Sequence, residues 1–264
     1  MNINNAENTT EQVNAIQHTA THFFISGVGI FIVCIVVTLP IIFFFINSLL
    51  NKILATVSED RPRILNSGRK KKILIFGDST AYGTGASTVE ESIAGRFAHD
   101  FPSVQIINYA QNGARVSDVF GQLEQARDDT ANLILISVGG NDAWRFTAYE
   151  SVDQNIRYIL QRAKYLSGGR VILMLYNNSG SAPAFPFFMR SLLLRKSKEI
   201  NILLSNAAMD NHVSVAPVFF DELDIPKNFF SGDGLHPSSE GYRIWYGRLW
   251  AVLFEKMNEY ELRD

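Results

Sequence analysis

Four short blocks of polar and glycine residues carry the chemistry available to this chain. They occupy residues 77–80 (Gly-Asp-Ser-Thr), 112–113 (Asn-Gly), 139–142 (Gly-Gly-Asn-Asp) and 233–237 (Asp-Gly-Leu-His-Pro). Together they supply a serine hydroxyl, an unhindered backbone amide, a side-chain amide and an aspartate–histidine pair. A nucleophile, two oxyanion donors and a base with its orienting acid are the parts that ester hydrolysis through an acyl-enzyme requires.

Ser79 is the predicted nucleophile, and a free hydroxyl needs a base within hydrogen-bond reach. His236 is the predicted base, because Asp233 precedes it by three residues on a glycine-containing loop and can hold one ring nitrogen while the other faces Ser79. Two alternatives stay open. The serine could instead cap the next helix, and Asp233 could cap a turn that contains His236 incidentally.

Three donors are expected to form the oxyanion hole: the backbone N–H of Gly113, the side-chain amide of Asn141 and the backbone N–H of Ser79. The Asn-Gly dipeptide also favours a simple turn, and Asn141 could instead cap a helix.

Competing motifs are weak. The segment Gly83-Thr84-Gly85 lacks the third glycine of a dinucleotide fingerprint, no Walker lysine follows the first strand, and the G-x-S-x-G elbow is absent. No Cys/His cluster has metal-binding spacing, so neither a metal nor a cofactor is expected. A net charge of −2 gives no reason to expect nucleic acid as a partner.

Apolar runs at residues 72–77, 104–108, 133–138, 170–175 and 213–219 predict strands buried on both faces. Helical patterns separate or follow them at residues 89–101, 117–127, 149–166, around 189–209, and 238–257. This alternation predicts a five-stranded parallel sheet covered by helices on both faces. Ser79, Gly113 and Asn141 would then follow three successive strands, at the sheet edge where such folds bind ligands.

The four blocks resemble those of the SGNH, or GDSL-type, serine hydrolases over roughly residues 72–257. The signature residues of that family match Ser79, Gly113, Asn141 and His236, and Asp233 matches its acid, whereas Thr80 stands where the family often has leucine. The resemblance implies a flavodoxin-like three-layer α/β/α sandwich. It also implies a metal-free hydrolase of ester bonds (EC 3.1 class) that acts on acyl esters, thioesters, lysophospholipids or acetylated sugars.

Residues 23–46 contain no charged side chain and would span roughly 36 Å as a helix, enough to cross a bilayer. They predict a single transmembrane anchor between a polar tail (1–22) and a linker (47–71) that leads to the hydrolase domain (72–264). A buried core helix and a cleaved signal peptide are the alternatives. Basic residues follow the anchor and none precedes it, so the charge bias favours a cytoplasmic hydrolase domain.

The segment 178–195 is unusually apolar for a connection that follows a strand. Phe185, Phe187, Phe188 and Met189 are hypothesised to line an acyl pocket or to lie against the bilayer, and core packing is the alternative. The sequence as a whole predicts a membrane-anchored esterase or lipase-like hydrolase. A carbohydrate deacetylase, an acyltransferase or an inactive membrane-bound binding module are the other candidates.

Overall fold

The structure of the chain is a computed structural model. It describes residues 62–176, 178–219, 225–226, 228–257 and 260–262, together with residues 34, 35, 38, 39, 42 and 43. The chain divides into two units, Met1–Ile53 and Leu54–Asp264. The predicted tail, most of the predicted anchor at 23–46 and the linker up to residue 61 lie outside the described residues. Within the described part, no helix combines the length and apolar character needed to cross a membrane.

The second unit is built on a six-stranded mixed sheet in the order β1-β3-β2-β4-β5-β6. The strands are β1 (Arg63–Leu65), β2 (Lys71–Gly77), β3 (Val104–Asn108), β4 (Leu133–Ser137), β5 (Val171–Leu175) and β6 (Ser214–Pro217). All neighbours from β3 to β6 run parallel, and that part of the sheet has the doubly wound order of flavodoxin-like folds.

The prediction of a purely parallel, five-stranded sheet is wrong by one strand, because β1 pairs antiparallel with β3. The three residues of β1 fall inside the stretch predicted as a linker. A run this short shows no periodicity of its own. It forms because the edge of β3 would otherwise expose unpaired backbone groups, which Arg63–Leu65 cover from Asn108 to Ile106.

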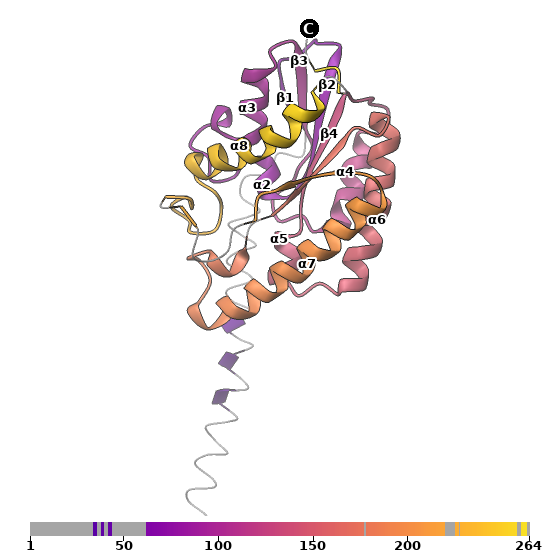
Figure 1. The fold of residues 1–264 in the computed structure, drawn as a ribbon. Coiled ribbons are helices and arrows are strands. Elements are labelled where there is room, and N and C mark those ends of the chain that lie inside the picture. The colour runs from indigo at the N-terminus through magenta and orange to yellow at the C-terminus, as the bar shows by residue number, and fades with distance from the viewer. Residues whose placement is uncertain are drawn as a thin grey trace, which may run out of the picture. The chain divides into compact units, whose positions relative to one another are not determined.

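Helices cover both faces of the sheet, as predicted, and give three layers (Figure 1). On one face lie α3 (Ile93–Asp100) and α8 (Ser239–Lys256), and on the other α4 (Val119–Gln125), α6 (Tyr149–Ser167) and α7 (Arg190–Asp210). Two short helices, α2 (Ser79–Tyr82) and α5 (Gly140–Trp144), follow β2 and β4 directly. Short 3-10 turns include η2 (Val116–Asp118), η3 (Ser179–Ser181) and η4 (Phe187–Met189).

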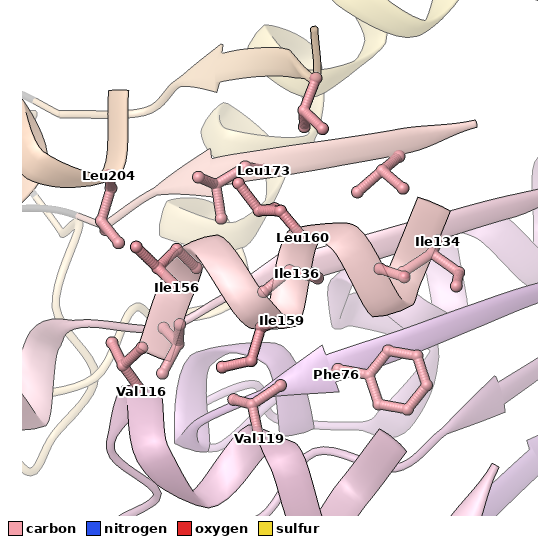
Figure 2. Packing of buried hydrophobic residues seen from close by; sticks show 14 of the residues in the cluster. Phe76, Val116, Val119, Ile134, Ile136, Ile156, Ile159, Leu160, Leu173 and Leu204 are labelled. Atoms are coloured by element: carbon pink, nitrogen blue, oxygen red, sulfur yellow. The ribbon is translucent and has the colours of Figure 1, made fainter. Parts of the chain in front are cut away.

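Successive strand residues pack into two different cores, which explains why the strand sequences show no polar alternation. Ile73 and Ile75 of β2 pack with α3 and α8, whereas Leu74 and Phe76 pack with α4 and α6. Figure 2 shows the second of these cores. There α6 lays Ile156, Ile159 and Leu160 over the sheet, and all three side chains are at most 1% exposed.

The carboxyl end of β2 is held by a buried glutamine. Gln122 of α4 accepts a hydrogen bond from the Gly77 N–H and donates one to the Gly77 carbonyl, both at 2.8 Å. The next residue, Asp78, donates its N–H to the Ser137 carbonyl at 3.0 Å. These bonds fix the point where the chain leaves the sheet, and they therefore fix the starting position of α2 and Ser79.

Replacing Gln122 with methionine keeps the volume of the side chain but leaves the Gly77 N–H without a partner, whereas the Gly77 carbonyl still accepts a hydrogen bond from Gln111 N at 3.1 Å. An unpaired buried donor costs about 1–3 kcal/mol, so Gln122→Met should lower the free energy of unfolding by about that amount. Urea unfolding measures the change. Gln125→Met is the matched control, because Gln125 lies on the same helix but is exposed. Equal effects of the two substitutions would contradict this account of the strand end.

Candidate active site

Ser79 is the first residue of α2 and is 5% exposed. The helix is capped by Asp78 and not by the serine, because the Asp78 carboxylate accepts hydrogen bonds from Thr80 N at 2.9 Å and Thr80 Oγ1 at 2.6 Å. The Ser79 hydroxyl is therefore released from capping, which disfavours the capping alternative. Its backbone N–H lies in the first turn of the helix, where amides have no intrahelical partner.

The Ser79 hydroxyl meets His236 of the loop that precedes α8. His236 Nε2 lies 2.9 Å from Ser79 Oγ, and His236 Nδ1 lies 2.6 Å from Asp233 Oδ2. The other oxygen, Asp233 Oδ1, accepts hydrogen bonds from the backbone N–H groups of Leu235 (2.8 Å) and His236 (3.0 Å). Asp233 therefore caps the turn and also contacts the His236 ring, so the turn is present but the position of His236 in it is not incidental.

The charge state of Asp233 decides which ring nitrogen carries the proton. Partial burial alone would raise the pKa of Asp233, but hydrogen bonds from the His236 ring, two backbone N–H groups and the Ser231 hydroxyl lower it well below the usual value. The carboxylate is ionised at neutral pH and can only accept. Nδ1 of His236 must then carry a proton toward Asp233, which leaves Nε2 free to accept the proton of Ser79.

The predicted oxyanion donors lie at the ends of β3 and β4. Asn141 is 5% exposed, and its Nδ2 donates to the Ala114 carbonyl at 2.9 Å while its Oδ1 accepts from Trp144 Nε1 at 3.1 Å. These bonds fix the amide orientation and leave the second hydrogen of Nδ2 for a ligand. Asn141 caps no helix, since Gly139 occupies the cap position of α5.

Gly113 does lie in a turn, closed by a bond from Ala114 N to the Gln111 carbonyl at 3.2 Å. Its φ of 76° is one that residues with a side chain rarely adopt. Within the described residues the Gly113 N–H makes no backbone hydrogen bond, so it remains a candidate donor. A turn and an oxyanion contact are compatible at this position.

Ser79, Asn141 and His236 border one cavity with a volume of about 70 Å³. Its apolar wall comes from four parts of the chain. These are α5, the segment that follows β5, the loop before α8, and α8 itself, which contribute Trp144, Tyr176, Ala182, Phe229, Phe230, Leu235, Pro237 and Trp245. A larger hollow of about 720 Å³ lies between β1, α3 and α8 and contains none of the predicted site residues.

The predicted acyl-pocket residues Phe185, Phe187, Phe188 and Met189 do not border this cavity. Phe185 is 4% exposed and packs behind the wall against Trp144, with ring centroids 6.4 Å apart. Phe187 and Phe188, on the turn η4, are 81% and 63% exposed, so the core-packing alternative fails for them. Sequence reasoning did not identify Trp144, which follows the Gly-Gly-Asn-Asp block in α5, or Trp245, which lies in α8 with no motif beside it.

The unassigned Gly83-Thr84-Gly85 segment packs against the histidine loop. A Cβ added to Gly85 would lie 2.4 Å from the Pro237 carbonyl and 2.8 Å from His236 Cβ. Thr84 donates its hydroxyl to Asn112 Oδ1 at 2.6 Å, and Tyr242 of α8 donates to the Thr84 carbonyl at 2.7 Å. This segment therefore joins the serine, Asn112-Gly113 and histidine blocks, and glycine at position 85 lets them approach.

Burial also governs the pKa values of two further carboxylates, Asp78, which borders the cavity, and Asp142 of α5. Burial raises the pKa of Asp78, and it raises the pKa of Asp142 from its usual 3.8 to about 6. The Val116 N–H donates to Asp142 Oδ2 at 2.9 Å and offsets only part of that penalty. No group of three or more potential metal-ligating side chains occurs among the described residues.

Comparison with known proteins relates this chain to a family of hydrolases. The model of the GDSL-like lipase/acylhydrolase family matches residues 75–244. A comparison with curated protein sequences finds no match. Among solved structures, a member of the lipolytic G-D-S-L family from Veillonella parvula is 21% identical, with a TM-score of 0.59 over 70% of this chain and 98% of that one.

Two other solved structures share the fold at lower identity. An esterase from a Pseudoalteromonas species is 18% identical, with a TM-score of 0.54 over 71% of this chain and 99% of that one. A variant of an acetyl xylan esterase from Geobacillus stearothermophilus is 18% identical, with a TM-score of 0.55 over 72% of this chain and 97% of that one.

The raised pKa of Asp142 predicts a dependence of stability on pH. The unfolded chain releases this proton near pH 4, whereas the folded protein keeps it until about pH 6. Stability should therefore fall as pH rises from about 4 to 6, with no further loss from this group above that range. Asp142→Asn keeps an oxygen for the Val116 N–H and should gain on the order of 2–3 kcal/mol over the wild type between pH 4 and 7.

Chemical unfolding at a series of pH values measures this difference. Asp128→Asn, at a side chain that is 92% exposed, controls for the loss of a negative charge. Parallel stability profiles for Asp142→Asn and the wild type would contradict the burial argument.

Proposed function

This chain belongs to the GDSL-like lipase/acylhydrolase family, whose members hydrolyse ester bonds, and we propose that it does so with Ser79, His236 and Asp233. The observation that carries the proposal is the continuous chain of contacts from Ser79 Oγ through the His236 ring to the Asp233 carboxylate, at 2.9 and 2.6 Å. These are the distances that a nucleophile, a general base and an orienting acid require.

In the first half of the reaction, Ser79 Oγ attacks the ester carbonyl carbon while its proton passes to His236 Nε2. The imidazolium that forms is stabilised by the ionised Asp233. Negative charge develops on the carbonyl oxygen, and the proposal assigns three donors to it: the N–H groups of Ser79 and Gly113 and the second Nδ2 hydrogen of Asn141. Ser79 and Asn141 border the cavity, whereas Gly113 does not. The carbon–oxygen bond to the alcohol then breaks, and His236 returns its proton to the leaving oxygen.

The second half repeats the same chemistry with water as the nucleophile. His236 Nε2 takes a proton from water as its oxygen attacks the acyl-serine carbonyl, and the same donors hold the oxyanion. Ser79 leaves with the proton that His236 returns, which regenerates the starting state. An alcohol in place of this water would give an acyltransferase with unchanged residue roles.

The size of the cavity favours short acyl groups. Its volume of about 70 Å³ is far below the roughly 300–1,000 Å³ typical of sites for drug-sized ligands. An acetyl or similarly short group fits such a space, whereas a long aliphatic chain would have to leave it. The second candidate, a carbohydrate deacetylase, is supported by this volume and by the structural neighbour that is an acetyl xylan esterase.

We also propose that residues 23–46 anchor the enzyme in a membrane, with the hydrolase domain on the cytoplasmic side. The support is the uncharged run of 24 residues and the basic residues that follow it, among them Lys52, Arg61 and Arg63. An anchor of this kind would confine hydrolysis to esters that reach the membrane surface.

Loss of the nucleophile and loss of an oxyanion donor should have different effects on turnover. Ser79→Ala should abolish turnover of p-nitrophenyl acetate above the rate in buffer, because no acyl-enzyme can form. Asn141→Ala should lower kcat by about 10²–10³ while leaving some turnover that still depends on Ser79. Ser191→Ala, at an exposed serine of α7 that does not border the cavity, is the matched control for a serine-to-alanine change. Near-wild-type turnover by folded Ser79→Ala protein would refute the mechanism.

The cavity wall should set the preferred acyl length. In a series of p-nitrophenyl esters, the wild type should favour acetyl and butyryl over octanoyl groups. Phe230→Ala opens the wall and should raise kcat/KM for octanoyl relative to acetyl esters by about tenfold, the scale of hydrophobic-pocket discrimination. Phe187→Ala and Phe188→Ala are matched controls, since neither ring borders the cavity. A shift produced by these controls and not by Phe230→Ala would reverse the assignment.

The proposed anchor can be tested by fractionating cells that express the full chain. The wild-type protein should sediment with membranes and resist extraction by alkaline carbonate. Lysines introduced by Val33→Lys and Val37→Lys each cost about 2.5–3.5 kcal/mol at the centre of a span, so the double variant should move to the soluble fraction with its esterase activity intact. Wild-type protein that is washed off by carbonate would rule the anchor out.

A further inference from the structure

Three residues that border the catalytic cavity carry a buried polar atom with no hydrogen-bond partner among the described residues. These atoms are Tyr176 Oη, Asn178 Nδ2 and Trp245 Nε1. The Ser197 hydroxyl of α7 is close enough to the Tyr176 hydroxyl to act as its hydrogen-bond partner. Asn178 and Trp245 are each 1% exposed, and their unpaired atoms are donors.

Asn178 is held rigidly, and its free atom is identified by its bonds. It precedes η3, where its Oδ1 accepts a hydrogen bond from the Gly180 N–H at 2.8 Å. Its own carbonyl accepts from Ser181 N at 3.1 Å and Ser181 Oγ at 2.6 Å. Since the Gly180 N–H can bond only to an oxygen, the amide cannot be flipped, and Nδ2 is the end left without a partner.

A buried N–H donor is costly unless something accepts from it. Asn178 and Ser79 border the same small cavity, so a substrate held for attack by Ser79 also lies beside Asn178. A substrate oxygen that reaches Nδ2 would supply the missing hydrogen bond. An aliphatic substrate would leave the donor unpaired.

We propose that Asn178 is a specificity-determining residue, whose Nδ2 binds a hydroxyl or ether oxygen in the alcohol part of the substrate. The proposed mechanism assigns Ser79, Gly113 and Asn141 to the ester carbonyl oxygen. Asn178 would therefore bind a different oxygen, in the alcohol part of the substrate. The inference rests on the proposed esterase function and narrows its substrate to esters of polyols or sugars. In such alcohols a neighbouring oxygen lies two carbons from the esterified one, within the reach of this cavity.

Trp245 supports the same conclusion independently. It lies on α8, on the opposite face of the sheet from α7, and its indole nitrogen can only donate. Two unpaired donors from different elements around one cavity suit a ligand with more than one acceptor oxygen. A cavity that binds only simple aliphatic esters would require neither donor.

The test compares two esters that share an acyl group and differ in the alcohol: glyceryl monoacetate and ethyl acetate. Both give the same acetyl-enzyme, so their kcat/KM values differ only through binding and acylation. The wild type should prefer glyceryl monoacetate. Asn178→Asp keeps an oxygen for the Gly180 N–H but removes the donor, and Asn178→Ser is a neutral variant that also retains a capping oxygen.

Both variants should reduce the ratio of kcat/KM for glyceryl monoacetate to that for ethyl acetate by at least about tenfold. An unchanged ratio would overturn the inference. So would an equal loss on both esters, which would instead make Asn178 another oxyanion donor or a purely structural residue. If the wild-type protein showed no Ser79-dependent turnover of either ester, that result would refute the proposed function itself. Turnover of ethyl acetate without any preference for glyceryl monoacetate would overturn only the role of Asn178.

Discussion

The contact between Ser79 Oγ and His236 Nε2 is the interaction on which the rest of this structure depends. It joins residues 157 positions apart at 2.9 Å, one at the end of the first long strand and the other in the last loop. A hydroxyl and an imidazole have no strong intrinsic affinity in water, so the fold must bring them together. Gln122 holds the strand end at Gly77, and the Asp233 carboxylate holds the loop through hydrogen bonds to both its backbone and the His236 ring.

The three carboxylates near this contact show how burial and hydrogen bonding compete. Burial tends to raise the pKa of Asp78, Asp142 and Asp233 alike. Only Asp233 receives enough hydrogen bonds to reverse the effect, and it is the one that must stay ionised beside His236. Asp78 and Asp142, whose pKa values are raised, instead hold backbone segments in place at Thr80 and Val116.

Sequence alone was sufficient for the parallel strands, the helices on both faces and the motif residues that converge at one sheet edge. Those features follow from buried apolar runs and from turn residues whose spacing is local. β1 was missed because three residues carry no periodic signal and pair only through the exposed edge of β3. Gln122 was missed because its partner, Gly77, lies 45 positions away and nothing near Gln122 indicates the contact.

Tertiary contacts also determine which residues form the cavity wall, and the sequence does not show those contacts. The apolar segment around residue 187 was expected to form the wall, yet Phe185 turns inward behind Trp144 while Phe187 and Phe188 face solvent. A non-periodic segment has no regular side-chain direction, so its composition cannot say which rings are buried. Trp144, Trp245 and Asn178 instead enter the cavity from α5, α8 and the segment after β5.

Covalent labelling with a fluorophosphonate tests the central claim most directly, because only an activated serine reacts rapidly with such a reagent. Mass spectrometry of the digested full-length protein should find one stoichiometric adduct, on Ser79. Its formation should be abolished by His236→Ala and should be prevented by prior acylation with a slowly released ester. A folded protein that hydrolyses esters while Ser79 stays unlabelled, or that carries the adduct on another serine, would contradict the account.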